Sequence, residues 1–140
     1  MGRFSETVMD HFMEPRNRGV LDDADAVGVS GSPGNGPYLI VYLKFRGRNV
    51  SDVRFQCHEC GATVASGSML TELIADSSIG ACQALTADQL AETLGGLPPD
   101  KLHCAGMAIH ALQSALKSLD VNTPRENHQL SPEVRSLGEL

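Results

Sequence analysis

Hydrophobic and polar positions recur with two different periods along the chain, and the change of period separates strands from helices. Phe4, Val8, Met9 and Phe12 recur at helical spacing. Pro15 should end this first helix, because the residue before a proline avoids the helical region. Residues 38–45 and 50–57 alternate with a period of two on either side of a turn at 46–49. This pattern predicts a β-hairpin with one buried face.

Every periodic segment after the hairpin predicts a helix. The expected helices cover residues 62–75, 79–85, 86–94 and 104–119. Before the hairpin, residues 28–37 hold four glycines and two prolines, which indicates an irregular loop and leaves room for a short strand at its start. Strands followed by helices predict an α+β fold with helices on one face of an antiparallel sheet.

The polar C-terminal end sets the expected domain boundary. After residue 120 apolar residues become sparse, so we expect one domain over residues 1–120 and a loose polar tail over 121–140. The sequence Ser131-Pro132-Glu133 would cap one short helix in that tail.

The composition narrows the possible functions. The chain has 140 residues, 41% of them hydrophobic, a formal net charge of −6 and only 11 Lys and Arg. With so few cations, little would drive binding to a phosphate backbone, so nucleic acid is not an expected partner. The sequence contains neither an apolar run long enough to span a membrane nor a secretion signal, and we expect a cytoplasmic location by default.

The four cysteines carry the candidate chemistry. They lie at positions 57, 60, 82 and 104, and cytoplasmic cysteines bind metal or react more often than they form disulfides. Cys60 precedes one predicted helix, and His103-Cys104 opens another. Because a helix N-terminus favours the thiolate, these two thiols and the imidazole would suit zinc, iron or an iron–sulfur cluster.

Cys57 has two possible roles. With Cys60 it forms a C-x2-C pair that, together with His103 and Cys104, would make a Cys3His set for tetrahedral zinc. Alternatively, Cys57 continues the apolar face of its strand and is simply buried, as free cysteines often are. Cys82, within a predicted short helix, is expected to be structural for the same reason.

The remaining histidines are expected to pack or to lie on the surface, because they lack ligand-like spacing to another cysteine or histidine. They are His11, His110 and His128.

Several short motifs occur in series along the chain. They are Asp10-His11-Phe12, Pro15-Arg16-Asn17 with Gly19, Cys60-Gly61-Ala62 with Ala65-Ser66, Thr71-Glu72, Leu97-Pro98-Pro99 with Lys101, and His103-Cys104. In this order the chain resembles the NifU/IscU-type iron–sulfur cluster scaffold proteins over roughly residues 3–120. The resemblance implies a three-stranded antiparallel sheet covered by helices, and a scaffold or carrier rather than an enzyme.

The resemblance also implies partners and a cargo. Proteins of this family take sulfur from a cysteine desulfurase, assemble a 2Fe-2S cluster with iron and pass the cluster to recipient apoproteins. An Hsp70-type chaperone reads the Leu-Pro-Pro segment, which is Leu97–Lys101 in this chain. Asp100 stands there at a position that some members fill with an apolar residue.

The family's ligands are three cysteines, an aspartate and a histidine. The resemblance assigns the second cysteine to Cys60, the histidine to His103 and the third cysteine to Cys104. In the first ligand loop, Asn35 stands at the position of the first cysteine and Pro37 at that of the aspartate. A neutral amide is a poor cluster ligand, and the side chain of proline offers no ligand atom.

Three functions therefore stay open. The first is a scaffold that holds iron or a cluster through Cys60, His103 and Cys104, with a further ligand from Cys57 or a partner. The second is a divergent relative that binds zinc or accepts persulfide sulfur on Cys104, for which one exposed, reactive thiolate suffices. The third is a dithiol redox protein that uses Cys57 and Cys60, which the absence of predicted βαβ units disfavours.

Overall fold

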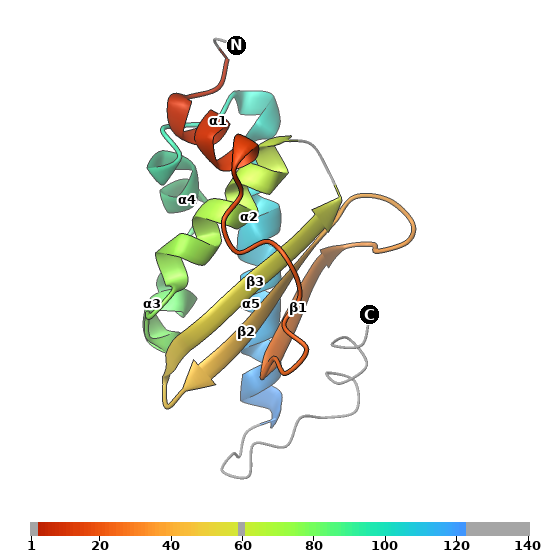
Figure 1. Cartoon of the computed structure of the whole chain (residues 1–140), viewed down its shortest axis with the longest axis vertical. Helices are drawn as coiled ribbons and strands as arrows, with labels where there is room; N and C mark the ends of the chain where they lie inside the picture. The colour runs from red at the N-terminus through yellow and green to blue at the C-terminus, as the bar shows by residue number, and fades with distance from the viewer. Residues whose placement is uncertain (1–2, 59–60, 123–140) are drawn as a thin grey trace.

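The computed structural model describes residues 3–58 and 61–122, with side chains as far as Leu119. The described elements are α1 (Glu6–Met13), β1 (Ala26–Gly31), β2 (Tyr38–Arg46), β3 (Asn49–His58), α2 (Gly61–Ile74), α3 (Ile79–Ala84), α4 (Ala87–Thr93), a 3-10 turn η1 (Pro99–Lys101) and α5 (Leu102–Asn122) (Figure 1). The predicted first helix, hairpin and later helices are all present. The expected α+β fold is therefore confirmed.

The sheet has three antiparallel strands in the order β1-β2-β3. The strand β1 is the short strand for which the glycine-rich segment left room, and it begins at Ala26, two residues before that segment. The register pairs Gly31 with Tyr38 and Tyr38 with His58. The loop between β1 and β2 and the C-terminal end of β3 consequently lie at the same end of the sheet.

The helices cover one face of the sheet, as expected. Leu39, Val41 and Leu43 of β2 and Phe55 of β3 belong to the main core, together with residues from α2, α4 and α5. The opposite face carries a smaller cluster of Val27, Ile40 and Tyr42, against which the segment before β1 packs. Figure 1 shows α5 behind the sheet and the connection from α1 to β1 passing in front of it.

The longest helix, α5, packs very closely on β1. Alanines at positions 105, 108, 111 and 115 form its buried stripe, and Leu112 and Leu116 are buried beside them. A Cβ atom on Gly28 would lie only 1.9 Å from the carbonyl oxygen of Ala111, so only glycine fits there. This small-residue contact fixes the position of α5 relative to the sheet.

The ends of the helices differ slightly from the prediction. The last helix begins at Leu102 rather than Cys104, because η1 leads directly into it, and it continues to Asn122. Residues 123–140, including Ser131-Pro132-Glu133, lie outside the described residues, so the expected domain boundary near residue 120 stays a prediction. Thr86 is the N-cap of α4 and forms a capping box with Gln89. Within residues 3–58 and 61–122, no helix has the length and apolar character of a membrane span.

Candidate metal site

The predicted ligands belong to chain segments at one end of the sheet. The helix α5 runs opposite to β1, so its N-terminus lies at the end where β1 and β3 finish (Figure 1). The loop over residues 32–37 leaves β1 at the same end. Cys60, the predicted ligand before α2, lies outside the described residues. The topology thus places the first ligand loop, the end of β3 and the start of α5 at one end of the sheet.

His103 and Cys104 are the two predicted ligands that the structure describes together. The Sγ atom of Cys104 lies 3.7 Å from Nε2 of His103. Both residues are in the first turn of α5, immediately after η1, whose Lys101 N–H donates to the carbonyl of Pro98 at 2.8 Å. In the described part of the chain, no group of three or more Cys, His, Asp and Glu is close enough to hold a metal ion. The described residues thus provide a pair of candidate ligands.

Cys104 differs from the expectation of an exposed thiolate. Its relative exposure is 0%, while His103 beside it is exposed. Cys104 lies four residues before Ala108 and seven before Ala111, so it falls on the same inward stripe of α5. Any chemistry at the Cys104 sulfur therefore requires the start of α5, or a segment covering it, to move.

The two other cysteines that the structure describes, Cys57 and Cys82, have the surroundings of core residues. Cys57 is 9% exposed and belongs to the main core on the same face of β3 as Val53 and Phe55, which is the second of its two expected roles. Its role as a ligand stays a prediction. Cys82 is fully buried in the same core, and burial raises the pKa of its thiol, as expected for a structural cysteine.

His58 follows Cys57 but faces the other side of the sheet. Its ring stacks on Tyr38 with the ring centroids 6.2 Å apart and the planes 20° apart. Alternation along β3 therefore separates these two side chains of the Cys-His-Glu-Cys segment. It leaves Cys57 in the core and His58 exposed.

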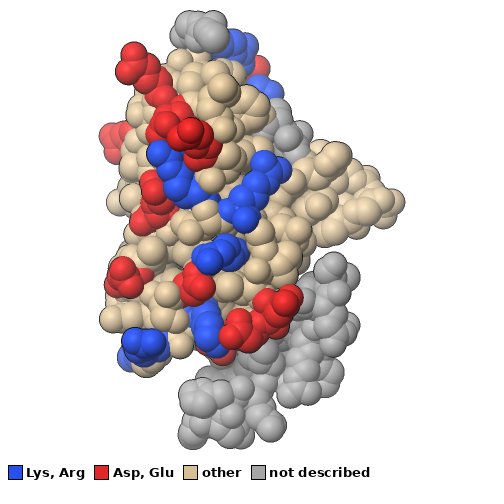
Figure 2. Space-filling view, viewed as in Figure 1, with Lys and Arg blue, Asp and Glu red and all other residues tan. Residues whose placement is uncertain are grey.

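The first ligand loop is closed by its own backbone. The N–H of Asn35 donates to the carbonyl of Ser32 at 2.9 Å, and the N–H of Ser32 donates to the carbonyl of Pro37 at 3.1 Å. The side chain of Asn35 is exposed. Figure 2 shows that the protrusion formed by this loop carries no charged side chain, whereas charges of both signs are spread over the rest of this face. The loop therefore contributes neither a thiolate nor a carboxylate to the site.

The N-terminal motif, residues 10–17, holds α1 and the segment after it against α2, and we call these contacts the frame. His11 is only 4% exposed, which confirms its expected packing role. The backbone N–H of Arg16 donates to Oγ of Ser68 at 2.8 Å, and the same Ser68 hydroxyl is hydrogen-bonded to Nδ1 of His11 at 2.7 Å. Nε2 of His11 faces Glu72 at 3.5 Å. Burial, followed by the charge of Arg16, lowers the pKa of His11.

Two further motif residues complete this frame. The guanidinium of Arg16 donates to Asp10 at 2.7 Å, which lowers the pKa of that carboxyl group. Asn17, in the left-handed conformation with φ of 62°, donates from Nδ2 to Oγ1 of Thr71 at 3.0 Å. A Cβ atom on Gly61 would lie only 2.9 Å from the nearest ring atom of Phe12, so the ring fills the space of a side chain there. These contacts fix α1 and the segment after it against α2.

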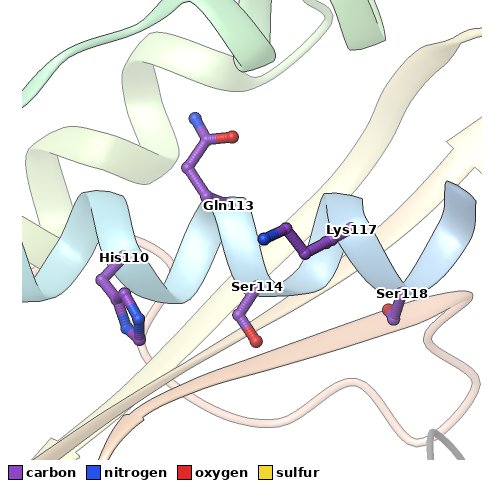
Figure 3. Close-up of a pocket in the computed structure, with 5 residues that line it drawn as sticks. All are labelled: His110, Gln113, Ser114, Lys117 and Ser118. Atoms are coloured by element: carbon purple, nitrogen blue, oxygen red, sulfur yellow. The ribbon is translucent and has the colours of Figure 1, made fainter.

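A separate shallow groove runs along the exposed side of α5. It has a volume of about 350 Å³ and is lined by His110, Gln113, Ser114, Lys117 and Ser118. Figure 3 shows His110, Ser114 and Ser118 on one side of the helix and Gln113 pointing away from them. Gln113 donates to the backbone carbonyls of Cys82 and Gln83, so it ties α3 to α5. The residues that line this groove have polar side chains, and they include neither His103 nor Cys104.

Comparison with known proteins gives consistent matches. Residues 3–125 match the model of the NifU-like N-terminal domain family. The iron–sulfur cluster assembly scaffold protein IscU of Aquifex aeolicus is 41% identical over 116 residues, which make up 81% of this chain and 74% of that relative. The protein named IscU 1 of Archaeoglobus fulgidus is 38% identical over 135 residues, or 96% of this chain and 85% of that relative.

Solved structures agree on the fold. The crystal structure of a putative iron–sulfur cluster assembly scaffold protein for the SUF system from Fervidobacterium islandicum superposes with a TM-score of 0.66. The match covers 82% of this chain and 97% of that one at 21% identity. At that identity the likeness concerns the fold alone.

Proposed function

Because this chain belongs to the NifU-like N-terminal domain family, we propose that it is an iron–sulfur cluster assembly scaffold, a carrier rather than an enzyme. Its relatives at 35–41% identity carry that name. The cluster, which we take to be 2Fe-2S, would be cargo that the protein holds for a time. A cysteine desulfurase would supply the sulfur, and apoproteins would receive the cluster.

The proposed ligands are Cys60, His103 and Cys104. The observation that carries the assignment is the contact between Cys104 Sγ and His103 Nε2 at the start of α5. Cys60 immediately precedes Gly61, the first residue of α2. A thiolate in that position would benefit from the helix dipole. Soft thiolate and imidazole donors match the preferences of iron and zinc.

The first ligand loop makes this scaffold incomplete by itself. Asn35 and Pro37 replace a thiolate and a carboxylate, and the loop carries no charged side chain. A further ligand must then come from a partner or from Cys57. Cys57 packs in the core, so, like Cys104, it would have to leave its packing to reach the cargo.

Anaerobic reconstitution with iron and sulfide tests the assignment through the visible absorption of the cluster. Cys60→Ser and Cys104→Ser should each lower the bound iron sharply. Cys82→Ala is the matched control, because it removes a buried thiol far from the proposed ligands in the sequence. Equal iron in all variants would refute the ligand set. Zinc bound in place of iron, with the same dependence on the two cysteines, would favour the zinc-binding alternative.

A further inference from the structure

The N-terminal residues Arg3, Phe4 and Ser5, called here the N-terminal strap, lie on the connection between α4 and α5. The guanidinium of Arg3 donates from one nitrogen to both carboxylate oxygens of Asp100, at 2.8 and 3.0 Å. The same guanidinium lies over the ring of Phe4, with 5.4 Å from its central carbon to the ring centroid. Phe4 itself packs against the main core. The strap is therefore attached to Asp100 through the side chain of Arg3 and to the main core through the side chain of Phe4.

Ser5 makes the second attachment. Its hydroxyl donates to the carbonyl of Leu94 at the end of α4 and accepts from the N–H of Val8 at the start of α1. Gly95, with φ of +85°, leaves room for this approach, because a Cβ there would lie 2.9 Å from that of Ser5. Two separate points of the α4–α5 connection, Leu94 and Asp100, are thus held by three consecutive residues.

The segment under the strap is Leu97–Lys101, which the family resemblance assigns to an Hsp70-type chaperone. It is not extended here. Pro99–Lys101 form the 3-10 turn η1, which the hydrogen bond from Lys101 N–H to Pro98 closes. Leu97 is partly buried against the main core. A partner that binds Leu97 and the prolines as an extended peptide must first open η1 and detach Leu97.

We propose that the N-terminal strap locks the Leu97–Lys101 segment in this closed form, and that release of the strap presents the segment to its partner. The role of the partner rests on the proposed function. Asp100 supplies the charge that makes the lock possible, since an apolar residue at that position would leave Arg3 without this contact. Because η1 leads directly into α5, opening the segment also loosens the first turn of α5, which carries Cys104.

Amide hydrogen exchange tests the lock without any partner. Arg3→Glu replaces the ion pair by a repulsion, and the Lys101 amide should then exchange about two- to five-fold faster, the range expected for an exposed pair. Arg3→Glu combined with Asp100→Arg reverses the pair and should restore the slow exchange. Arg48→Glu, in the turn of the β-hairpin, is the matched control for the change in charge. Unchanged exchange in Arg3→Glu would overturn the lock, and Arg3→Ala repeats the test should the Glu variant fold poorly.

Binding to an Hsp70-type chaperone in its ADP state tests the second half of the proposal. The full-length Arg3→Glu protein should bind more tightly than the wild type by the same factor as its exchange increases. A synthetic peptide of residues 96–102 should bind more tightly than either. If the peptide binds the chaperone but the wild type and the Arg3→Glu protein bind it with equal affinity, the gating by the strap is overturned. A peptide that does not bind would instead reject the chaperone as a partner and the gating with it, while the exchange rates still decide whether the lock exists.

Discussion

Replacing Gly28 by alanine should destabilise the fold strongly, because β1 and α5 meet there backbone to backbone. The added Cβ would lie 1.9 Å from the carbonyl oxygen of Ala111 and 2.5 Å from the backbone nitrogen of Ala115. Neither atom belongs to a side chain that can change its rotamer. The only relief is a displacement of α5 from the sheet by roughly 1 Å or more, which opens the tightly packed interface around it.

The expected loss can be estimated from the kind of contact. Forcing a methyl group into a packed core costs about 1–3 kcal/mol when side chains can adjust. Because both neighbours of Gly28 are backbone atoms, we expect about 3 kcal/mol or more. Domains of this size are stable by only about 5–15 kcal/mol. The substitution should therefore remove a large part of the stability and shift the helix that carries His103 and Cys104.

Urea unfolding followed by far-ultraviolet circular dichroism measures this loss. With a slope of about 1–3 kcal/mol per molar urea, the midpoint of Gly28→Ala should fall by at least about 1 M. Gly106→Ala is the matched control within α5, because a Cβ there meets nothing within 4 Å. Alanine in a helix is preferred to glycine, so this control should be neutral or stabilised by about 0.5–1 kcal/mol. Equal midpoints for the Gly28 variant and the wild type would refute the close contact.

Three further predictions concern the frame and the site. Because burial and Arg16 lower the pKa of His11, wild-type stability should fall as the pH drops below about 6.5, where the unfolded chain takes up the proton first. In a plot of urea midpoints against pH, His11→Phe should flatten this part of the curve. Equal slopes for the variant and the wild type would contradict the argument. His103→Ala should weaken metal affinity about 10-fold or more in a chelator competition, whereas unchanged affinity in a folded variant would make His103 structural. Asn35→Cys with Pro37→Asp should lengthen the life of a reconstituted cluster, judged by the decay of its visible absorbance; a wild type with the same lifetime would show that the first loop is not limiting.

The strands show where periodicity is a sufficient guide and where it is not. The hairpin of β2 and β3 was predictable because β3 alternates and the turn is polar, but the expectation of one buried face is wrong for β2, whose central residues are buried on both faces. The strand β1 was left as a possibility because Gly28 and Gly31 disfavour a strand. In the structure Gly28 is present because α5 comes too close for any side chain. This reason lies in a contact between residues more than 80 positions apart, which no local pattern contains.

The candidate site shows the same limit at the level of single side chains. The adjacency of His103 and Cys104 is visible in the sequence, and the structure keeps their side chains together. The burial of Cys104 was not predicted, because its place at a helix N-terminus predicts a thiolate and not a position of the buried stripe. In the structure it lies four residues before Ala108 and seven before Ala111, and the phase of the buried alanine stripe decides that it faces inward.

The N-terminal motif explains why residues with the chemistry of an active site can serve packing. The first two-thirds of α2 is buried on every side and consists largely of small residues, so apolar contacts alone would let α1 slide along it. The hydrogen bonds between His11 and Ser68 and between Asn17 and Thr71 remove this freedom, because each has one geometry in which both partners are satisfied. With Phe12 packed where a side chain on Gly61 would be, the frame extends to the first residue of α2. We infer that its function is to hold the start of that helix in place for the proposed ligand that precedes it in the chain.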